Sequence, residues 1–364
     1  MQAIPTSTNG TVTVSPPLTV AADMAPSWKN LSSSDFDDAA HAIVTAHKND
    51  GAAADVPVMD LRTWGIIPAD GRFALAPLGK QHGPLALRSN GFSNLATKLG
   101  APSDFVRDKL PAPLQLGVMN WLLASSDKPV PATLRLRGTE VAAVVSDRYC
   151  PLDQEDLMSC VRAALAQQGA LEDIEVKSIA TGLVDVIRLV FPAEEKPVKV
   201  GDVSALGLDI SSSSFGKSAV HVRGLIWRLK CTNGLRVAEG MGAYAFRHVG
   251  RDSDRIRAGI AEAIPSALAV ARGTFDRWRS AVNVMVNEVA SLIDCLRDLT
   301  LGEKKLVEQE VQREAGTSAL PEYMPLYGFL NGVTAAAHHV LPARRLELES
   351  LAGELLVRHT GGPS

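Results

Sequence analysis

Basic and aromatic side chains gather in one stretch of the chain, residues 217–257, in a pattern that suits contact with a polyanion. Nine Lys and Arg stand there against three acids, a local net charge of +6, whereas the whole chain carries −3. Cationic side chains neutralise phosphates, and aromatic rings stack on bases. The stretch therefore predicts a nucleic-acid surface, with single-stranded DNA as the partner, and points to binding more than to catalysis.

The expected contact residues share a positive charge or a ring. They are Lys217, Arg223, Trp227, Arg228, Lys230, Arg236, Tyr244, Arg247, His248 and Arg251, with Arg135 and Arg137 as a second patch. A serine-rich loop at 211–214 precedes Lys217 and could touch a backbone phosphate, although it lacks the spacing of a P-loop. A plain strand connection is the alternative. Along 218–230 the charges fall on both faces of the expected strand, so one continuous surface is not implied.

Catalytic signatures such as GxGxxG, HExxH and GxSxG are absent from the sequence. Asp185 and Asp209 each lie in an apolar run, which favours a buried, hydrogen-bonded role; a two-carboxylate metal site of a nuclease is the alternative. His338 and His339 would point about 100° apart on a helix, which does not suit one metal. The sequence therefore predicts no catalytic residue, no metal ligand and no cofactor.

The four cysteines lie far apart, without a CxxC pair, which predicts reduced thiols in the cytoplasm. Cys231 and His248 lack an obvious third group that would orient a catalytic pair. The chain has no run of 18 apolar residues and no signal-like N-terminus, so we expect no membrane partner.

The pattern of expected strands and helices around these residues predicts the α+β class. We expect a central antiparallel sheet of hairpins flanked by helices, and a helical C-terminal third. Strands are expected within 132–149, 172–180, 183–192, 197–212, 218–230, 235–238 and 243–249. The pair Asn233-Gly234 is a typical tight-turn sequence between the last long strand and its return. Beyond 252 the apolar spacing is helical, and Pro265 is expected to break or kink the first helix.

Three regions are expected: a flexible acidic leader at 1–56, an α+β core with the basic hairpin at 57–251, and a helical region at 252–364. The leader could cover a basic groove as a mimic of DNA, but a solvated helix is the plainer interpretation. Two expected helices within 91–110 resemble a helix-turn-helix, although ordinary packing is favoured there.

Four segments, 144–158, 213–237, 246–250 and 325–353, resemble the phage/plasmid-like family catalogued as domain of unknown function 932. The most specific element runs from the serine loop through Arg-X-X-Cys-Thr-Asn-Gly at 228–234 to Arg-His-X-Gly at 247–250. The resemblance implies a phage or plasmid setting and suggests similarity to single-strand annealing proteins. We therefore expect an ATP-independent recombination factor that forms rings or filaments of identical subunits. A metal-dependent nuclease and a non-catalytic regulatory protein are the alternatives.

Overall fold

The structure is a computed structural model that describes residues 18–32, 34–79, 83–229, 233–237, 243–250 and 253–361. Contacts group the chain into two units. The smaller unit comprises Met1–Asp23 and Ala53–Asp147, and the larger unit comprises Met24–Ala52 and Arg148–Ser364. The stretch expected as a leader contributes to both: one strand and one helix belong to the larger unit, and another strand belongs to the smaller.

The smaller unit is a six-stranded sheet with helices packed on it. Its strand order is β2-β6-β7-β5-β4-β3, and only the β5–β7 pair is parallel. The strands are β2 (Ala53–Val58), β3 (Trp64–Ala69), β4 (Arg72–Pro77), β5 (Leu85–Leu87), β6 (Ala132–Arg137) and β7 (Glu140–Val145). The helices are η1 (Leu61–Thr63), α2 (Ser89–Lys98), α3 (Ser103–Lys109) and α4 (Ala112–Ser125).

The predicted hairpin within 132–149 is confirmed as β6 and β7, and Gly138 takes a positive φ of 57° in the turn. Helix α2 lies directly on β7, because a Cβ added at Gly91 would sit 2.4 Å from the carbonyl oxygen of Val141. Phe73, Phe92 and Leu134 belong to the core that these elements enclose. The pair α2–α3 thus has a packing role inside this unit, the interpretation that the sequence favoured.

The larger unit contains a seven-stranded antiparallel sheet in the order β1-β8-β9-β10-β11-β12, with the seventh strand, β13, also paired to β11. The strands are β1 (Ser27–Asn30), β8 (Glu175–Thr181), β9 (Asp185–Lys199), β10 (Asp202–Ser212), β11 (Val220–Arg228), β12 (Asn233–Arg236) and β13 (Ala243–Phe246). The predicted strands between 172 and 230 are confirmed, and the curled sheet with its helices confirms the α+β class.

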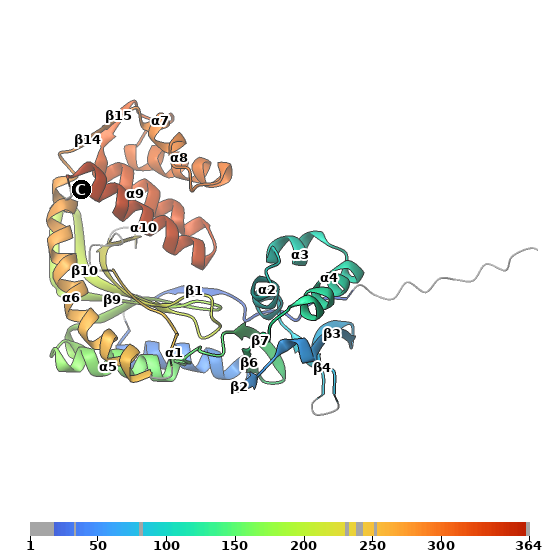
Figure 1. Ribbon diagram of the computed structural model, residues 1–364. Coiled ribbons are helices and arrows are strands. Elements are labelled where there is room, and N and C mark those ends of the chain that lie inside the picture. Colours follow the sequence, from blue (N-terminus) through green and yellow to red (C-terminus); the bar gives the residue numbers. More distant parts are fainter. Residues whose placement is uncertain are drawn as a thin grey trace, which may run out of the picture. The chain divides into compact units, whose positions relative to one another are not determined.

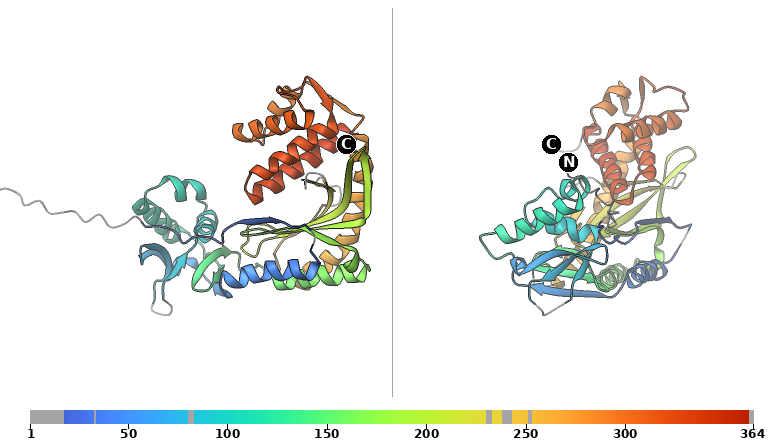
Figure 2. Two further views of the ribbon diagram at one scale, coloured as in Figure 1. Left: turned by 180° about the vertical axis from the view of Figure 1, so that it is seen from behind. Right: turned by 90° about the vertical axis from the view of Figure 1, so that its right-hand side faces the viewer.

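Helices lie on both faces of this sheet (Figures 1 and 2). One face is covered by α1 (Phe36–Asn49), α5 (Gln154–Gln167) and α6 (Ser253–Ser280). The C-terminal part contains α7 (Val289–Asp294), α8 (Leu301–Ala315), α9 (Leu326–Ala336), the short 3-10 turn η3 (Ala337–His339) and α10 (Pro342–His359). Another 3-10 turn, η2 (Leu171–Asp173), lies between α5 and β8. A small sheet of β14 (Met285–Asn287) and β15 (Tyr323–Pro325) interrupts the otherwise helical region.

Alternation along the strands gives the two faces of the sheet opposite character. Leu208, Ile210 and Val222 point toward α5 and α6 and share an apolar core with them. Their neighbours Asp209 and Arg223 pair across strands β10 and β11 and therefore point to the opposite face. That second face carries buried charge, and α10 lies against it.

One local prediction is wrong. Asn233 and Gly234 are not the turn: they are the first residues of β12 and pair with Arg228 and Trp227 of β11. Gly234 is closely packed there, because an added Cβ would lie 3.0 Å from Leu225 Cδ1. Of the two outcomes expected at Pro265, a break is contradicted, since α6 runs through it from Ser253 to Ser280; a kink stays a prediction. Within the described ranges, no helix has both the length and the apolar character that crossing a bilayer requires.

Candidate nucleic-acid interface

The predicted contact residues fall into two classes by exposure. Lys217 and Arg247 are exposed, and Tyr244 is half-buried. The others that the structure describes are buried to 6% exposure or less: Arg223, Trp227, Arg228, Arg236, His248, Arg135 and Arg137. Lys230 and Arg251, like Cys231, lie outside the described residues. Among the cations of the basic stretch that the structure describes, Arg223, Arg228 and Arg236 are thus interior, whereas Lys217, Arg247 and Arg255 are exposed.

Arg228 is buried because acids from two distant segments surround its guanidinium group. Its Nε donates to Asp202 Oδ1 at 3.0 Å, and its Nη1 donates to Glu314 Oε2 at 3.1 Å. Burial disfavours the charged form, but the hydrogen bonds to these carboxylates outweigh it and raise the pKa of Arg228. In the smaller unit, Arg135 likewise pairs with Asp55 at 3.2 Å. These arginines hold elements together inside each unit.

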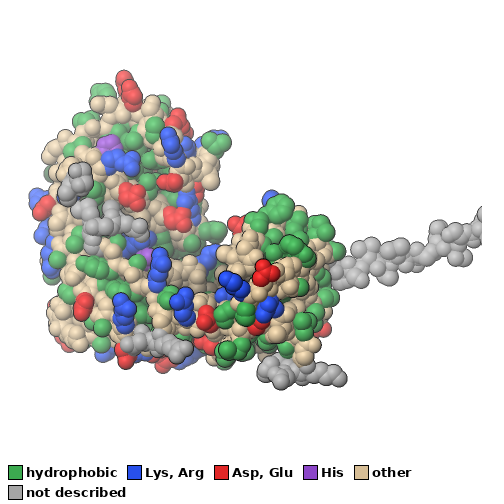
Figure 3. All heavy atoms as spheres, in the orientation of Figure 1, with side chains coloured by type: hydrophobic (Ala, Val, Ile, Leu, Met, Phe, Trp, Pro, Cys, Tyr) green, Lys and Arg blue, Asp and Glu red, His purple; other side chains and the backbone are tan. Residues whose placement is uncertain are grey.

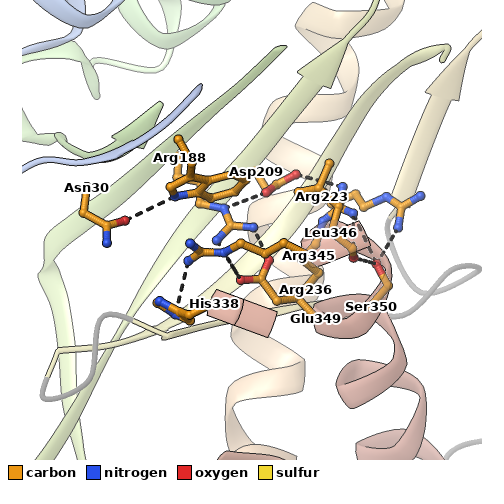
Figure 4. Close-up of polar contacts among 11 residues, drawn as sticks. Asn30, Arg188, Asp209, Arg223, Arg236, His338, Arg345, Leu346, Glu349 and Ser350 are labelled. Carbon is orange, nitrogen blue, oxygen red and sulfur yellow. Dashed lines mark hydrogen bonds and ion pairs between the residues drawn. The ribbon is translucent and has the colours of Figure 1, made fainter. Parts of the chain in front are cut away.

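A fully buried arginine, Arg188 of β9, is the centre of a larger ionic network on the charged face of the sheet (Figure 4). Its Nε donates to Asp209 Oδ2 at 2.9 Å, and its Nη1 donates to Glu349 Oε1 at 3.0 Å. Arg345 of α10 donates to the same Glu349 oxygen at 3.0 Å. The ring of Trp28 lies 4.7 Å from the Arg188 guanidinium carbon and 4.0 Å from that of Arg345. Strands β1, β9 and β10 are thus joined to α10.

Two of the predicted contact residues extend this network. Arg236 Nη2 donates to Asp209 Oδ1 at 2.8 Å, and its Nη1 donates to the carbonyl oxygen of Leu346 at 3.1 Å. Arg223 Nη1 donates to Ser350 Oγ at 3.1 Å. Burial lowers the pKa of Arg236, and the positive charges of Arg223 and Arg188 lower it further, while Asp209 opposes them. Both arginines face α10 and not bulk solvent.

The two acids considered for a nuclease site have separate protein partners. Asp209 binds the arginines above, and Asp185 accepts from His47 Nε2 at 2.8 Å and from the side-chain amide of Gln154. Burial raises the pKa of Asp185, although His47 opposes the shift. Asp185 lies on the helix-covered face with Ser212, its neighbour across β9 and β10, whereas Asp209 lies on the charged face. No group of three or more His, Cys, Asp or Glu that could hold a metal occurs in the part of the chain that the structure describes.

The serine loop is held in place by backbone and aromatic contacts. Ser213 Oγ accepts the amide protons of Phe215 and Lys217, each at 3.1 Å. Tyr149 donates to the Ser213 carbonyl oxygen at 3.3 Å and stacks on His248 with ring centroids 5.2 Å apart. His248 is therefore buried as a support of the loop, while the Lys217 side chain stays exposed.

A pocket of about 500 Å³ lies between β13 and α6. It is lined by Ala245, Phe246, Arg247, Val249, Arg255, Ile256, Ala258, Gly259 and Glu262. Phe246 is fixed closely against α6, because a Cβ added at Gly259 would lie 2.3 Å from its ring. Two exposed arginines, an aromatic ring and one acid thus meet at an open surface. Elsewhere the face of the larger unit seen in Figure 3 mixes Lys and Arg with Asp and Glu.

Comparison with known families supports one part of the resemblance drawn from the sequence, the domain of unknown function. Residues 141–353 match a family described as a domain of unknown function (DUF932), and this range covers more than half of the chain. The chain belongs to this family. The DUF932 range takes in the serine loop, the pocket beside β13 and most of the ionic network. No curated protein and no solved structure matches this chain.

Sequence reasoning missed the acids that bury these arginines. Glu349 and Glu314 lie 161 and 86 positions from Arg188 and Arg228, on helices that give no local signal of the pairing. Trp28, which stacks on Arg188, lies outside the DUF932 range altogether. One sequence pattern could have indicated these buried ion pairs. Arginine and aspartate alternate with apolar residues in the expected strands, and a charged side chain buried in a strand needs a buried partner of opposite charge.

Proposed function

We propose that the protein binds single-stranded nucleic acid through its phosphates, at the surface made by the serine loop, Arg247 and the pocket between β13 and α6. One observation supports this proposal most. Lys217, Arg247 and Arg255 are exposed, and within the described ranges none of them is joined to an acid by an ion pair. Exposed cations beside a fixed aromatic ring suit sequence-independent contact with a backbone and a base.

The arrangement limits how many phosphates this surface can neutralise. Arg223, Arg228 and Arg236 are held by protein partners, so they add little to phosphate contact. Three exposed cations, Lys217, Arg247 and Arg255, remain among the described residues of this surface, and each phosphate contact to a single strand contributes about −0.7 to the slope of log affinity against log salt. These three cations therefore contribute about −2 to the expected slope, less than the whole basic stretch would give.

The finer part of the proposal is a cytoplasmic, ATP-independent annealing factor of a phage or plasmid that acts as a homo-oligomer. It is supported by the resemblance of segments 213–237 and 246–250 and by membership of the DUF932 family. Annealing needs a strand that is held by its backbone with its base edges free, which is what contacts through phosphates would supply. Mixing complementary labelled strands with the protein, without ATP, measures this directly.

Fluorescence anisotropy of a labelled single-stranded oligonucleotide, titrated over salt, tests the binding proposal. We expect the variant Lys217→Gln/Arg247→Gln to bind more weakly and its salt slope to flatten by about 1.4. Arg162→Gln is the matched control, because Arg162 is equally exposed but pairs with Asp37 at 2.8 Å in another part of the unit. A protein that does not bind the oligonucleotide at low salt, or a double variant with unchanged affinity and slope, would reject this surface.

A further inference from the structure

A helix of the smaller unit, α4, presents an apolar face outward. Residues 110–126, which contain this helix, hold no Lys, Arg, Asp or Glu. Trp121 is 66% exposed and Leu114 is 54% exposed, and Gly117 and Ala124 are exposed beside them. Hydrophobic side chains gather over α3 and α4 in the space-filling view (Figures 1 and 3). A surface helix normally carries polar residues on its outward face, so the pattern of α4 is inverted.

The polar side chains in the middle of α4 point inward. Gln115 Nε2 donates to the carbonyl oxygens of Arg107 and Leu110, at 2.7 Å and 2.8 Å. The side-chain oxygen of Asn120 accepts the amide proton of Ile66 at 2.8 Å, and its Nδ2 donates to the carbonyl oxygen of Ile66 at 2.8 Å. Ile66 belongs to β3, the edge strand of the six-stranded sheet, so Asn120 covers an open strand edge. These contacts fix the helix and determine which face points outward.

The outward residues have the spacing of a seam between two helices. Leu114, Gly117, Trp121 and Ala124 follow one another at intervals of 3, 4 and 3 positions, which is the a and d spacing of a heptad. If a second copy of α4 lies antiparallel along this seam, Leu114 meets Ala124 of that copy. Trp121 then meets Gly117 of the same copy. Each large side chain thus faces a small one, and the two-fold axis repeats both contacts.

Gly117 has no packing role inside its own chain. A Cβ added at Gly117 would meet no atom within 4 Å. Glycine in the middle of a helix weakens that helix, because it has the greatest backbone freedom to lose. A second helix that approaches closely, with Trp121 placed over Gly117, accounts for a glycine at this position.

The size of the face suits a weak pair of subunits. Leu78, 74% exposed, borders α4, because a Cβ added at Gly65 would lie 3.3 Å from Leu78 Cδ2 and 3.5 Å from Asn120 Oδ1. With Leu114, Trp121 and the small residues between them, the face offers about 500 Å² of apolar surface. Two copies would therefore bury about 1,000 Å², near the lower limit for a specific interface.

We propose that the outward face of α4 binds the same face of a second copy of this chain, antiparallel and about a two-fold axis. The face carries no charge, so pairing buries no uncompensated ion. Helices that lie on membranes carry Lys and Arg on their polar side, which α4 lacks, so a protein surface is the better match. The inference names a contact for the homo-oligomer of the proposed function and rests on that part of it alone, not on nucleic-acid binding.

Sedimentation velocity of the full chain over the micromolar range measures this pairing. We expect a reversible monomer–dimer equilibrium with a dissociation constant of about 1–100 µM. Trp121→Ala should weaken it at least about 30-fold, because both copies lose a central aromatic side chain. Gly117→Gln should weaken it at least about ten-fold and keep the fold, since the space around Gly117 is open within the chain. Tyr323→Ala, which removes a 64% exposed ring of the larger unit, is the matched control and should change nothing.

Cross-linking tests the antiparallel register. With the exposed Cys295 replaced by Ser, the variant Leu114→Cys/Ala124→Cys should form a covalent dimer in oxidised glutathione. Leu114→Cys alone should not, because ten helical positions separate the two copies of residue 114 from contact by about 15 Å.

The proposal is overturned if the protein is monomeric throughout the micromolar range, or if Trp121→Ala and Gly117→Gln both leave the association unchanged. A monomer that binds phosphatidylcholine vesicles through Trp121 would identify a membrane surface instead. Efficient cross-linking of Leu114→Cys alone would reject the antiparallel pair. Sedimentation is measured without nucleic acid, so failure of the oligonucleotide titration does not alter its result.

Discussion

Replacing Arg228 tests whether this arginine is part of the interior or of a binding surface. In the structure its guanidinium group makes five hydrogen bonds, three to Asp202 and two to Glu314. The side chain of Asp202 is only 1% exposed, so Arg228→Met would leave a carboxylate that water cannot reach. Removing one partner of such a buried pair costs about 3–5 kcal/mol. Glu314, 19% exposed, would recover part of its hydration, so we expect a value near the lower end.

Urea unfolding followed by circular dichroism measures the loss. Arg162→Met is the matched control, because its ion pair with Asp37 is exposed and should contribute about 0.5 kcal/mol or less. Adding Asp202→Asn to Arg228→Met should recover about 1 kcal/mol or more, since the uncompensated charge is then removed. A loss below about 1 kcal/mol at an unchanged slope against urea, together with weaker oligonucleotide binding, would refute the reasoning and place Arg228 on the binding surface.

Three further outcomes are expected. Gly224→Ala should destabilise the protein by about 1–3 kcal/mol in urea unfolding, because the new Cβ would lie 2.8 Å from Ala271 Cβ. The control Gly273→Ala, in open space on α6, should stabilise the protein by about 0.5–1 kcal/mol, and equal effects of the two variants would contradict the close packing of β11 on α6. Burial and the charge of Arg345 lower the pKa of His338 to about 4, so the folded state favours the neutral ring and the free energy of unfolding falls as the pH is lowered from 6.5 to 4. In urea unfolding across that pH window, His338→Gln should lose roughly 2 kcal/mol less of this free energy than the parent protein. An identical pH dependence in the two proteins would contradict the assignment. Thr300→Ala removes the capping box of α8 and should lower the thermal midpoint by an amount equivalent to about 1 kcal/mol, and an unchanged midpoint would show that this cap contributes nothing.

The class and most strands of the fold could be predicted because hairpin patterns are local. The pair β6–β7 and the succession β8 to β11 follow from alternation and turn residues within 10 to 30 positions. The pair Asn233-Gly234 is the exception: a sequence typical of a tight turn lies in strand β12, where Leu225 and Arg188 pack closely on Gly234. Local turn preference gave way there to side-chain packing across the sheet.

The candidate site was less predictable, because net charge does not show which side of the protein a charge faces. Arg228 and Arg247 look alike in the sequence, but Arg228 has Asp202 and Glu314 beside it, whereas Arg247 is exposed. Those acids come from a strand start and a distant helix, and their position depends on the tertiary fold. The DNA-binding role itself stays a prediction that the oligonucleotide titration tests.

The ionic network around Arg188 also limits which shortened fragments of the larger unit can fold. Arg188 and Asp209 come from the sheet, but the second carboxylate, Glu349, comes from the final helix. A fragment that ends before α10 would keep Arg188 in the sheet and lose one of its two counter-charges and much of the cover that excludes water. We expect such fragments to aggregate or be degraded, and a nascent chain to complete this unit only after its last helix has emerged from the ribosome.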